Sequence, residues 1–202
     1  MSEFTAGKLS KILKEHERWC DTGGDEGEKA DLEGADLSEA NLECAILYRA
    51  NLIEANLRGA DLVGANLSEA ILEAADLVGA NLIGAILSQA DLSEADLRGA
   101  NLRDAFLPDA YLPEAYLRKA DLSNAALYRA DLGGANLREA DLHDANLSFA
   151  NLSYADLTQV KNLSINQLSK AKTLYEAKLD PELKKQVKDK YPHLLKKPKY
   201  LE

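Results

Sequence analysis

The sequence predicts an all-β solenoid, in which the chain winds into stacked coils, with a helical segment at each end. Ala stands at every fifth position from Ala30 to Ala155, and Leu stands at every fifth position from Leu32 to Leu157. Residues 30–159 therefore form 26 consecutive pentapeptides without an exception. The flanking segments lack this five-residue period and have apolar residues at helical spacing instead.

A five-residue period fits neither a helix nor a flat strand. Five residues advance an α-helix by about 500°, so successive Leu side chains would spiral around it. Side chains alternate faces along a strand, so Leu side chains five positions apart would point to opposite sides of a sheet. Only a chain that bends once in each repeat buries every Leu. Ala and Leu then face inward together, the residue between them faces outward, and the last two residues form a corner at which Gly recurs.

The repeats closely resemble the pentapeptide-repeat family, whose motif is A(D/N)LXX. Ala35–Glu39 reads Ala-Asp-Leu-Ser-Glu, and Ala55–Gly59 reads Ala-Asn-Leu-Arg-Gly. The resemblance implies a right-handed quadrilateral β-helix with four pentapeptides in each coil. Four Arg residues that follow a core Leu are separated by multiples of 20, which supports four sides: Arg58, Arg98, Arg118 and Arg138. The block then makes about 6.5 coils and is roughly 31 Å long at the inter-strand spacing.

Residues 1–29 are predicted to form an N-terminal capping helix and a linker. A solenoid leaves an open hydrophobic mouth at each end, which a cap must close. Over residues 7–21 one helical face carries the apolar positions and one histidine: Leu9, Ile12, Leu13, His16, Trp19 and Cys20. On this face His16 is interpreted as a capping residue that forms a hydrogen bond; a metal or acid–base role is the alternative. Gly23, Gly24 and Gly27 then form the linker.

Residues 160–202 are predicted to form a C-terminal helical cap and a basic tail. The five-residue register breaks after residue 160, and Ser164 is predicted to N-cap a short helix that ends near Lys172. Asp180 and Pro181 predict the N-terminus of a second helix. The segment carries eleven Lys and five acidic residues. We expect a solvated helix beside an acidic body; a membrane or nucleic-acid patch is the alternative.

The composition limits the class of protein. The net charge of −10 argues against direct binding of a nucleic-acid backbone. Cys20 and Cys44 have no metal-ligand spacing and are predicted to be free thiols, with a disulfide bond as the alternative. Met1 to Lys11 lacks the apolar stretch of a signal peptide, and no apolar run approaches the roughly 20 residues of a membrane span. We therefore expect a cytoplasmic protein, similar to bacterial members of the family, with no membrane contact.

The sequence contains no catalytic constellation, and it predicts no enzyme, no cofactor and no metal site. The three histidines lie in unrelated segments, and no Ser or Cys has a base at a recognised spacing. Most carboxylates occupy the slot before Leu or the corner, where Asp and Asn side chains bond the turn backbone. They are therefore interpreted as turn residues rather than as acid–base pairs.

Sorting the repeats by their phase in the coil gives four walls. Walls one, two, three and four begin at Ala30, Ala35, Ala40 and Ala45, and each continues every 20 residues. Wall one is the candidate acidic face, with eight acids and neither Lys nor Arg: Asp31, Glu33, Glu54, Glu73, Asp91, Glu94, Glu114 and Asp131. Wall two has six acids and five bases, and its stacked Arg98, Arg118 and Arg138 are predicted to pair with carboxylates: Asp96, Glu94, Glu114 and Asp121.

Wall four has no net charge and carries the candidate protein-binding residues. The slot before Leu is Asp or Asn in 19 of the 26 repeats, and four of the seven exceptions lie on wall four. The candidate residues on or next to this wall are Ile46, Tyr48, Ile86, Phe106, Tyr111, Tyr128 and Phe149. Contiguous apolar strips usually mark an interface. The alternative is that these side chains cover each other or lie beneath a terminal cap.

Two functions follow from these walls. The first is a non-enzymatic protein-interaction or scaffold module that binds a protein partner, or a second copy as a homo-oligomer, through wall four. The second, implied by the family resemblance, is a DNA mimic that binds a topoisomerase or another DNA-binding protein. A duplex of this length would carry roughly 18 phosphates, against a net charge of −14 for residues 30–159. Two features count against DNA mimicry: the charged walls are separated by nearly neutral ones, and the C-terminal tail is basic. No motif supports a glycan- or metabolite-binding module.

Overall fold

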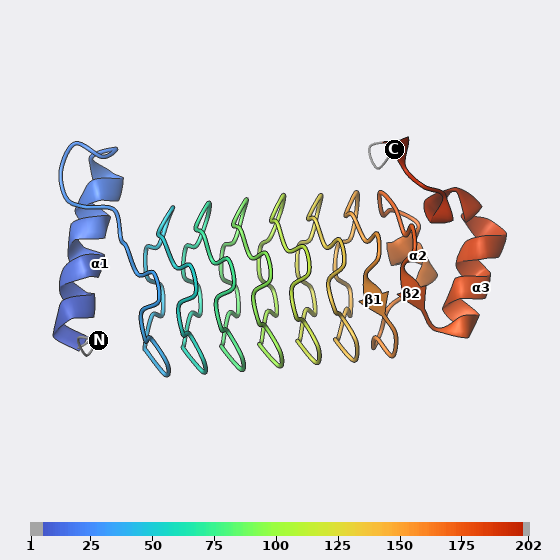
Figure 1. Ribbon diagram of the computed structural model, residues 1–202, viewed down its shortest axis with the longest axis horizontal. Coiled ribbons are helices and arrows are strands. Elements are labelled where there is room, and N and C mark those ends of the chain that lie inside the picture. Colours follow the sequence, from blue (N-terminus) through green and yellow to red (C-terminus); the bar gives the residue numbers. More distant parts are fainter. Residues whose placement is uncertain (1–5, 200–202) are drawn as a thin grey trace.

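The computed structural model describes residues 6–199, which form a stack of coils with helices at both ends (Figure 1). Helix α1 lies at the N-terminal end of the stack, and α2 and α3 lie at the C-terminal end. The elements in chain order are α1 (Ala6–Asp21), β1 (Asp156–Leu157), α2 (Ile165–Leu168), β2 (Lys178–Leu179), α3 (Pro181–Lys190) and the 3₁₀ helix η1 (Pro192–Leu195). Strands β1 and β2 pair in parallel.

Parallel backbone bridges join each coil to the next at a spacing of 20 residues. The first bridge joins Asp31 to Asn51, and the same spacing holds as far as the bridge between Asp141 and Lys161. The hydrogen bonds are short, since the N–H of Leu32 donates to the Asn51 carbonyl at 2.7 Å. Bridge residues lie five positions apart, so each coil carries four of them. The predicted 20-residue coil is therefore confirmed.

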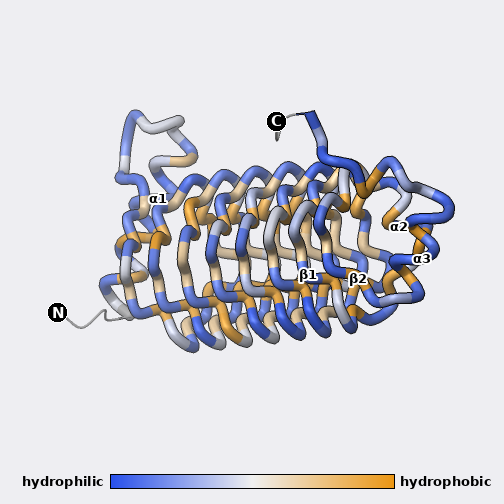
Figure 2. Tube along the Cα trace, turned by 45° about the vertical axis from the view of Figure 1, so that its right-hand side comes forward, coloured by the Kyte–Doolittle hydropathy of each residue, from blue (hydrophilic) through white to orange (hydrophobic). Residues whose placement is uncertain are grey.

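The Leu and Ala residues of the repeats form the core. Every one of them from Ala50 to Leu142 is at most 1% exposed, whereas Ala40 and Ala45 in the first coil are only partly buried. Apolar positions recur in every coil and line up along the stack in Figure 2. The predicted inward orientation of both residue types is confirmed, and the interior is filled by their side chains.

The fifth residue of each repeat turns the corner with a positive φ. Gly34 has φ 59°, and Arg49 and Phe149 adopt nearly the same angle at 60° and 62°. Glycine is thus favoured at the corner but not required, although a side chain in this conformation is strained. The corner N–H is satisfied by the next coil, as when Arg49 donates to the Ser68 carbonyl at 2.9 Å.

The outward Asp and Asn side chains hold the turn backbone, as predicted. Asp36 Oδ1 accepts from the N–H of Ser38 at 3.2 Å, and Asp91 Oδ1 accepts from the N–H of Ser93 at 3.0 Å. The same contact recurs in many repeats, because a short polar side chain two residues before the donor reaches it without strain. The second carboxylate oxygen of each Asp stays available for other partners.

Helix α1 packs against the first coil through the face that the sequence indicated. Leu9, Ile12 and Leu13 lie against the core. His16 is fully buried, and its Nδ1 accepts from the N–H of Ala30 at 3.0 Å, at the point where the first repeat begins. The ring of Trp19 stacks on the ring of His16, with centroids 5.6 Å apart. The predicted hydrogen-bonding role of His16 is confirmed.

We expect the packing of α1 to weaken as the pH falls below about 6.5. Burial lowers the pKa of His16 from its ordinary value of 6.5, and the nearby charge of Lys29 lowers it further. A lowered pKa means that the unfolded state binds the proton more readily, so the stabilisation is complete above pH 6.5 and is lost at lower pH. Trp19 is the single tryptophan of the chain, and its fluorescence reports this step directly.

The matched control for this prediction is His16→Gln, which keeps an acceptor but removes the titrating group. The fluorescence change between pH 7 and 5 should be present in the wild type and absent from the variant. A change of equal size in both proteins would show that another group controls the packing of α1.

The C-terminal segment differs from its prediction in two places. Ser164 N-caps α2 as predicted and forms a capping box with Gln167, but α2 ends at Leu168 and not near Lys172. The prediction was wrong in length because the chain must return to the stack, where Thr173 is bridged to Asn151. Gln167 anchors this turn to the preceding coil, since its Nε2 donates to the carbonyls of Leu142 and Ala145.

Helix α3 begins at Pro181, as predicted, but Asp180 does not cap it with its side chain. Asp180 Oδ2 instead accepts from the backbone N–H of Gln159 at 3.0 Å, which joins the start of α3 to the last regular repeat. Val187 of α3 is fully buried, and Leu183 and Tyr191 are partly buried against the core.

Parallel pairing continues beyond the last regular repeat at residue 159. Lys178 of β2 lies opposite Asp156 of β1, a spacing of 22 residues. The N–H of Leu174 donates to the carbonyl of Leu194 in η1 at 2.8 Å. Helix η1 thus provides a hydrogen-bond acceptor for the backbone at the C-terminal edge of the stack. Within residues 6–199, no helix has the length and apolar character needed to cross a lipid bilayer.

Candidate protein-binding surface

Four large apolar side chains of wall four project into solvent. Ile86 is 40% exposed, Phe106 49%, Tyr128 38% and Phe149 60%. Ile86 is bridged to Phe106, which is bridged in turn to Ala126, so these slots follow one another along the stack. We call Ile86, Phe106, Tyr128 and Phe149 the apolar strip.

The C-terminal part of the apolar strip is held in place by an aromatic contact. Tyr128 and Phe149 meet edge to face, with ring centroids 5.6 Å apart and an interplanar angle of 80°. The corner beside them is fixed by an ion pair between Arg129 Nε and Asp109 Oδ1 at 2.8 Å. Both rings therefore stand at a rigid edge of the coil, and most of the Phe149 surface remains open to solvent.

Ile46 and Tyr48, the first candidate residues on wall four, have different surroundings. Both are half-buried. The Tyr48 hydroxyl donates to Glu69 Oε1 at 3.1 Å, and Arg49 donates to Glu69 Oε2 at 2.7 Å. Ile46 lines an open cleft of about 750 Å³ between α1 and the first coil, together with Leu9 of α1. The structure thus separates this pair from the apolar strip.

Further exposed aromatic rings lie on wall one, which adjoins wall four, and on wall two, which is opposite it. Tyr111, on wall one, is 48% exposed, and Tyr116, on wall two, is 50% exposed. Tyr154 is 51% exposed and meets Tyr175 edge to face at 5.5 Å. Sequence reasoning missed the pair of Tyr154 and Tyr175. Tyr154 occupies the same corner position in its repeat as Phe149, which is the signal that could have found it.

The eight acids of wall one form no ion pair with any cation of residues 6–199. Six are exposed, and Asp91 and Asp131 are half-buried. None of the ion pairs formed within residues 6–199 involves any of the eight. Asn51 Nδ2 donates to Asp31 and to Glu33, so a neutral amide is the partner there. Wall one therefore presents uncompensated negative charge to solvent.

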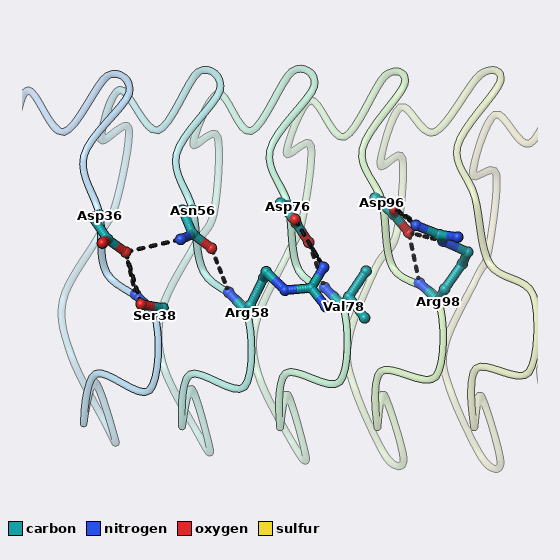
Figure 3. Close-up of polar contacts among 8 residues, drawn as sticks. All are labelled: Asp36, Ser38, Asn56, Arg58, Asp76, Val78, Asp96 and Arg98. Atoms are coloured by element: carbon teal, nitrogen blue, oxygen red, sulfur yellow. Dashed lines mark hydrogen bonds and ion pairs between the residues drawn. The ribbon is translucent and has the colours of Figure 1, made fainter.

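Wall two pairs most of its carboxylates with cations of the chain, as Figure 3 shows for Asp76 and Asp96, whereas Asp36 has neutral partners. Arg58 Nη1 lies 3.0 Å from Asp76 Oδ2, and Arg98 Nε lies 2.8 Å from Asp96 Oδ1. Burial raises the pKa of Asp96, but the hydrogen bonds from Arg98 outweigh burial and leave the pKa below its usual value.

The predicted partners of the other arginines on wall two were wrong. Arg118 pairs with Glu139 at 2.6 Å, and Arg138 also approaches Glu139. The hydrogen bond from Arg118 lowers the pKa of Glu139. Glu114 forms no ion pair within residues 6–199. Arg118 instead pairs with Glu139, the corner residue one coil further along wall two. Neither Glu94 nor Asp121 pairs with an arginine in the part of the chain described.

The thiol of Cys20 and the imidazole of His16 lie close together in α1, but their surroundings do not favour nucleophilic chemistry. Cys20 Sγ lies 3.7 Å from His16 Nε2. Burial, together with Asp21 and Glu17, raises the pKa of the Cys20 thiol, while burial lowers the pKa of His16. Both shifts favour the neutral forms, so this environment disfavours the thiolate. Cys20 and Cys44 are both free, as predicted, and no group of three or more metal-ligating side chains occurs in the described part of the chain.

Comparison with known proteins places the repeats in a described family. Residues 30–68, 50–89, 60–99, 90–127 and 125–161 match the family described as Pentapeptide repeats, with eight copies. No curated protein sequence matches the chain.

Solved structures similar to this chain come from several sources. HetL, a pentapeptide repeat protein involved in heterocyst differentiation regulation from the cyanobacterium Nostoc sp., is 33% identical over 74% of this chain and 83% of its own, with a TM-score of 0.24. A pentapeptide repeat protein from the Arabidopsis thaliana thylakoid lumen is 28% identical, over 69% and 72% of the two chains, with a TM-score of 0.20. A trypsin-treated variant of QnrB1, a plasmid-mediated fluoroquinolone resistance protein, is 19% identical, over 81% and 86%, with a TM-score of 0.30.

Proposed function

Since the chain belongs to the pentapeptide-repeat family, whose repeats form a right-handed β-helical solenoid, we propose that it is a non-enzymatic scaffold that binds a protein partner through the apolar strip of wall four. The family membership supports the solenoid and a protein-binding role. The identity of the binding wall rests on the side chains of this chain alone.

The exposure of the apolar strip is the observation that carries the proposal. Leaving a large apolar side chain in water forgoes about 1.5–3 kcal/mol relative to burial. The fold does not need Ile86 or Phe106, because Asn66 and Asn146 occupy the same slot on the same wall. A partner that buries these side chains would account for apolar residues at slots that Asn can fill. An interface of standard size buries about 800 Å² on each side, and the strip with its neighbouring rings is a suitable centre for one.

The remaining architecture is consistent with a scaffold. We infer that the four bridge positions of each coil define four walls of a quadrilateral, and that α1 and α3 cap its ends. Terminal caps keep the hydrophobic core of a solenoid from associating end to end. With its interior filled by Leu and Ala, the solenoid offers its outer walls, and not an internal cavity, to a partner.

We expect the double variant Ile86→Asn/Phe106→Asn to lose the partner without losing stability. Asn already serves this slot, so the turns and bridges should remain intact and the melting temperature should stay within a few degrees. The tagged variant and the wild type would be used to capture proteins from native lysate, and the proteins bound to each would be identified. A protein bound by the wild type should be absent from the variant.

The control is Tyr116→Asn, which removes an equally exposed ring from the same slot of wall two. This variant should retain the partner. If the partner were retained by the wall-four variant and lost with Tyr116→Asn, the binding wall would have been assigned wrongly. A shift in oligomeric state, measured by light scattering, would identify a second copy as the occupant.

A DNA mimic is the second candidate, and the uncompensated charge of wall one favours it. A mimic would compete with duplex DNA for a DNA-binding protein, and its competition would weaken when the acids of wall one are neutralised. The ion pairs of Asp76, Asp96 and Glu139 on wall two favour the scaffold instead, because they reduce the share of the circumference that presents free negative charge.

A further inference from the structure

Tyr111 stands between two carboxylates on wall one. Its slot is bridged to Asp91 in one neighbouring coil and to Asp131 in the other. Slots that are bridged lie about 4.8 Å apart, so the ring and the two carboxylates form one row along the wall. The side chain is 48% exposed, so much of its surface is accessible to a ligand.

Each of these carboxylates uses one oxygen for the fold and leaves the other available. Asp91 Oδ1 accepts from the N–H and the hydroxyl of Ser93, at 3.0 and 2.6 Å. Asp131 Oδ1 accepts from the N–H of Gly133 at 2.9 Å and from Asn151 Nδ2 at 2.8 Å. Neither Oδ2 atom forms a hydrogen bond or ion pair with any residue in the described range 6–199. The fold therefore positions both side chains and leaves their outer oxygens without a partner within residues 6–199.

Wall two has a similar row, in which Tyr116 lies between Asp96 and Asn136, and here the chain supplies the cation. Tyr116 occupies the equivalent slot and is bridged to Asp96. Arg98, two residues after Asp96, donates to both of its oxygens. On wall one the residues two positions after the slots are Ser93, Pro113 and Gly133, none of which carries a charge. Wall one thus has a tyrosine with two flanking carboxylates, where wall two has one carboxylate and an amide, and wall one lacks the cation.

We propose that wall one receives an arginine or lysine side chain of the protein partner, placed on the ring of Tyr111 between Asp91 and Asp131. A guanidinium stacks on an aromatic face and donates hydrogen bonds in its own plane, which suits a ring flanked by two free carboxylate oxygens. The inference rests on the proposed function, because it describes how the same partner is held. The partner surface is then apolar where it meets the strip and basic where it crosses onto wall one.

Tyr111 lies close to the apolar strip, so one partner surface can contact both. It follows Phe106 of the apolar strip by five residues, on the next wall of the same coil. Glu94 and Glu114 are exposed on wall one and add to its negative potential. A second copy of this chain that packed wall four against wall four would bring two acidic walls together, so charge complementarity favours a basic segment of a different protein.

The test uses a fluorescein-labelled peptide with alternating leucine and arginine, and the same peptide with citrulline in place of arginine. Citrulline keeps the shape of arginine and removes its charge. Fluorescence polarisation should give an affinity for the arginine peptide at least about tenfold higher than for the citrulline peptide, and this preference should decrease as salt is added. Equal binding of both peptides, or no binding of the arginine peptide, would overturn the proposal.

The variants locate the site. Asp91→Asn/Asp131→Asn keeps the turn acceptor Oδ1 and removes both charges, and it should weaken the arginine peptide about tenfold. Tyr111→Asn should weaken it by about fivefold. The control Asp61→Asn/Asp141→Asn changes the net charge equally in the same slot of wall three and should have an effect below about twofold. An equal loss with this control would show non-specific charge attraction and contradict the assigned site.

The two proposals can fail separately. If the captured partner is lost with Ile86→Asn/Phe106→Asn but fully retained with Asp91→Asn/Asp131→Asn, wall four binds the partner and the cation site is wrong. If the partner is retained with the wall-four variant, the proposed function is wrong, whatever the peptide result.

Discussion

Replacing Leu92 by Ala is expected to lower the free energy of unfolding by about 2–5 kcal/mol. Leu92 is 1% exposed in the middle of the stack. Its N–H donates to the Tyr111 carbonyl at 2.7 Å, so the backbone around it is fixed to the next coil. Because neighbouring coils hold the walls of the cavity apart, the space left by Leu92 cannot collapse. Urea unfolding monitored by far-UV circular dichroism measures the loss.

The comparison for Leu92→Ala is the neighbouring substitution Asp91→Ala. Asp91 points outward and contributes the turn hydrogen bonds to Ser93, so its removal should cost only about 0.5–1.5 kcal/mol. Losses of similar size for the two variants would contradict the assignment of inward and outward positions, on which the walls depend.

Replacing Gly27 by Ala is expected to displace α1 from the first coil. A Cβ at Gly27 would lie 2.2 Å from the carbonyl oxygen of Glu15 and 2.7 Å from the backbone nitrogen of Trp19, both part of α1. Its φ of +80° adds strain of about 1–2 kcal/mol for a residue with a side chain. Neither backbone atom can yield without moving the helix, so Trp19 fluorescence should shift towards that of a solvent-exposed indole.

Gly23→Ala is the matched control for this effect. Gly23 also has a positive φ of 67°, but no atom lies within 4 Å of its Cβ position. It should show the conformational strain without the displacement. Because stability in a solenoid is the sum of contacts between neighbouring repeats, Gly27→Ala should expose residues 6–29 to protease while the central coils keep their far-UV signal. Equal protection of both variants would contradict the tight packing at Gly27.

The sequence alone predicted the coil well because its side-chain period maps directly onto the backbone. One Leu in every five residues requires one bend in every repeat, and stacking follows when each repeat has an identical inward face. The same reasoning located the face of α1 and the role of His16. These features depend on spacing along the chain, which the sequence contains explicitly.

Features that depend on contacts between coils could not be predicted from spacing. Glu139 is the partner of Arg118 because a corner carboxylate of the next coil approaches it, and several nearby carboxylates are equally plausible in the sequence. Ile46 and Ile86 occupy the same slot on wall four, yet Ile46 is half-buried next to the cleft beside α1. Only the position of the helix distinguishes them.

The continuation of the stack past residue 159 was missed for a chemical reason. Lys178 and Thr173 stand in the outward slots where the repeats carry Asp or Asn. Ala177-Lys178-Leu179 keeps the spacing of Ala and Leu, and both of these residues are buried. A search for the inward pair alone, without the acidic slot, would have extended the pattern.

Hydroxyl-radical footprinting of the captured complex tests the central claim most directly, because it labels exposed aromatic side chains individually. Phe106, Tyr128, Phe149 and Tyr116 are all accessible in the free chain, so each should be labelled before binding. In the complex, labelling of Phe106, Tyr128 and Phe149 should fall severalfold, while Tyr116 on wall two should react as in the free chain. Protection of Tyr116 with unchanged labelling of the other three would show that the partner does not bind the apolar strip.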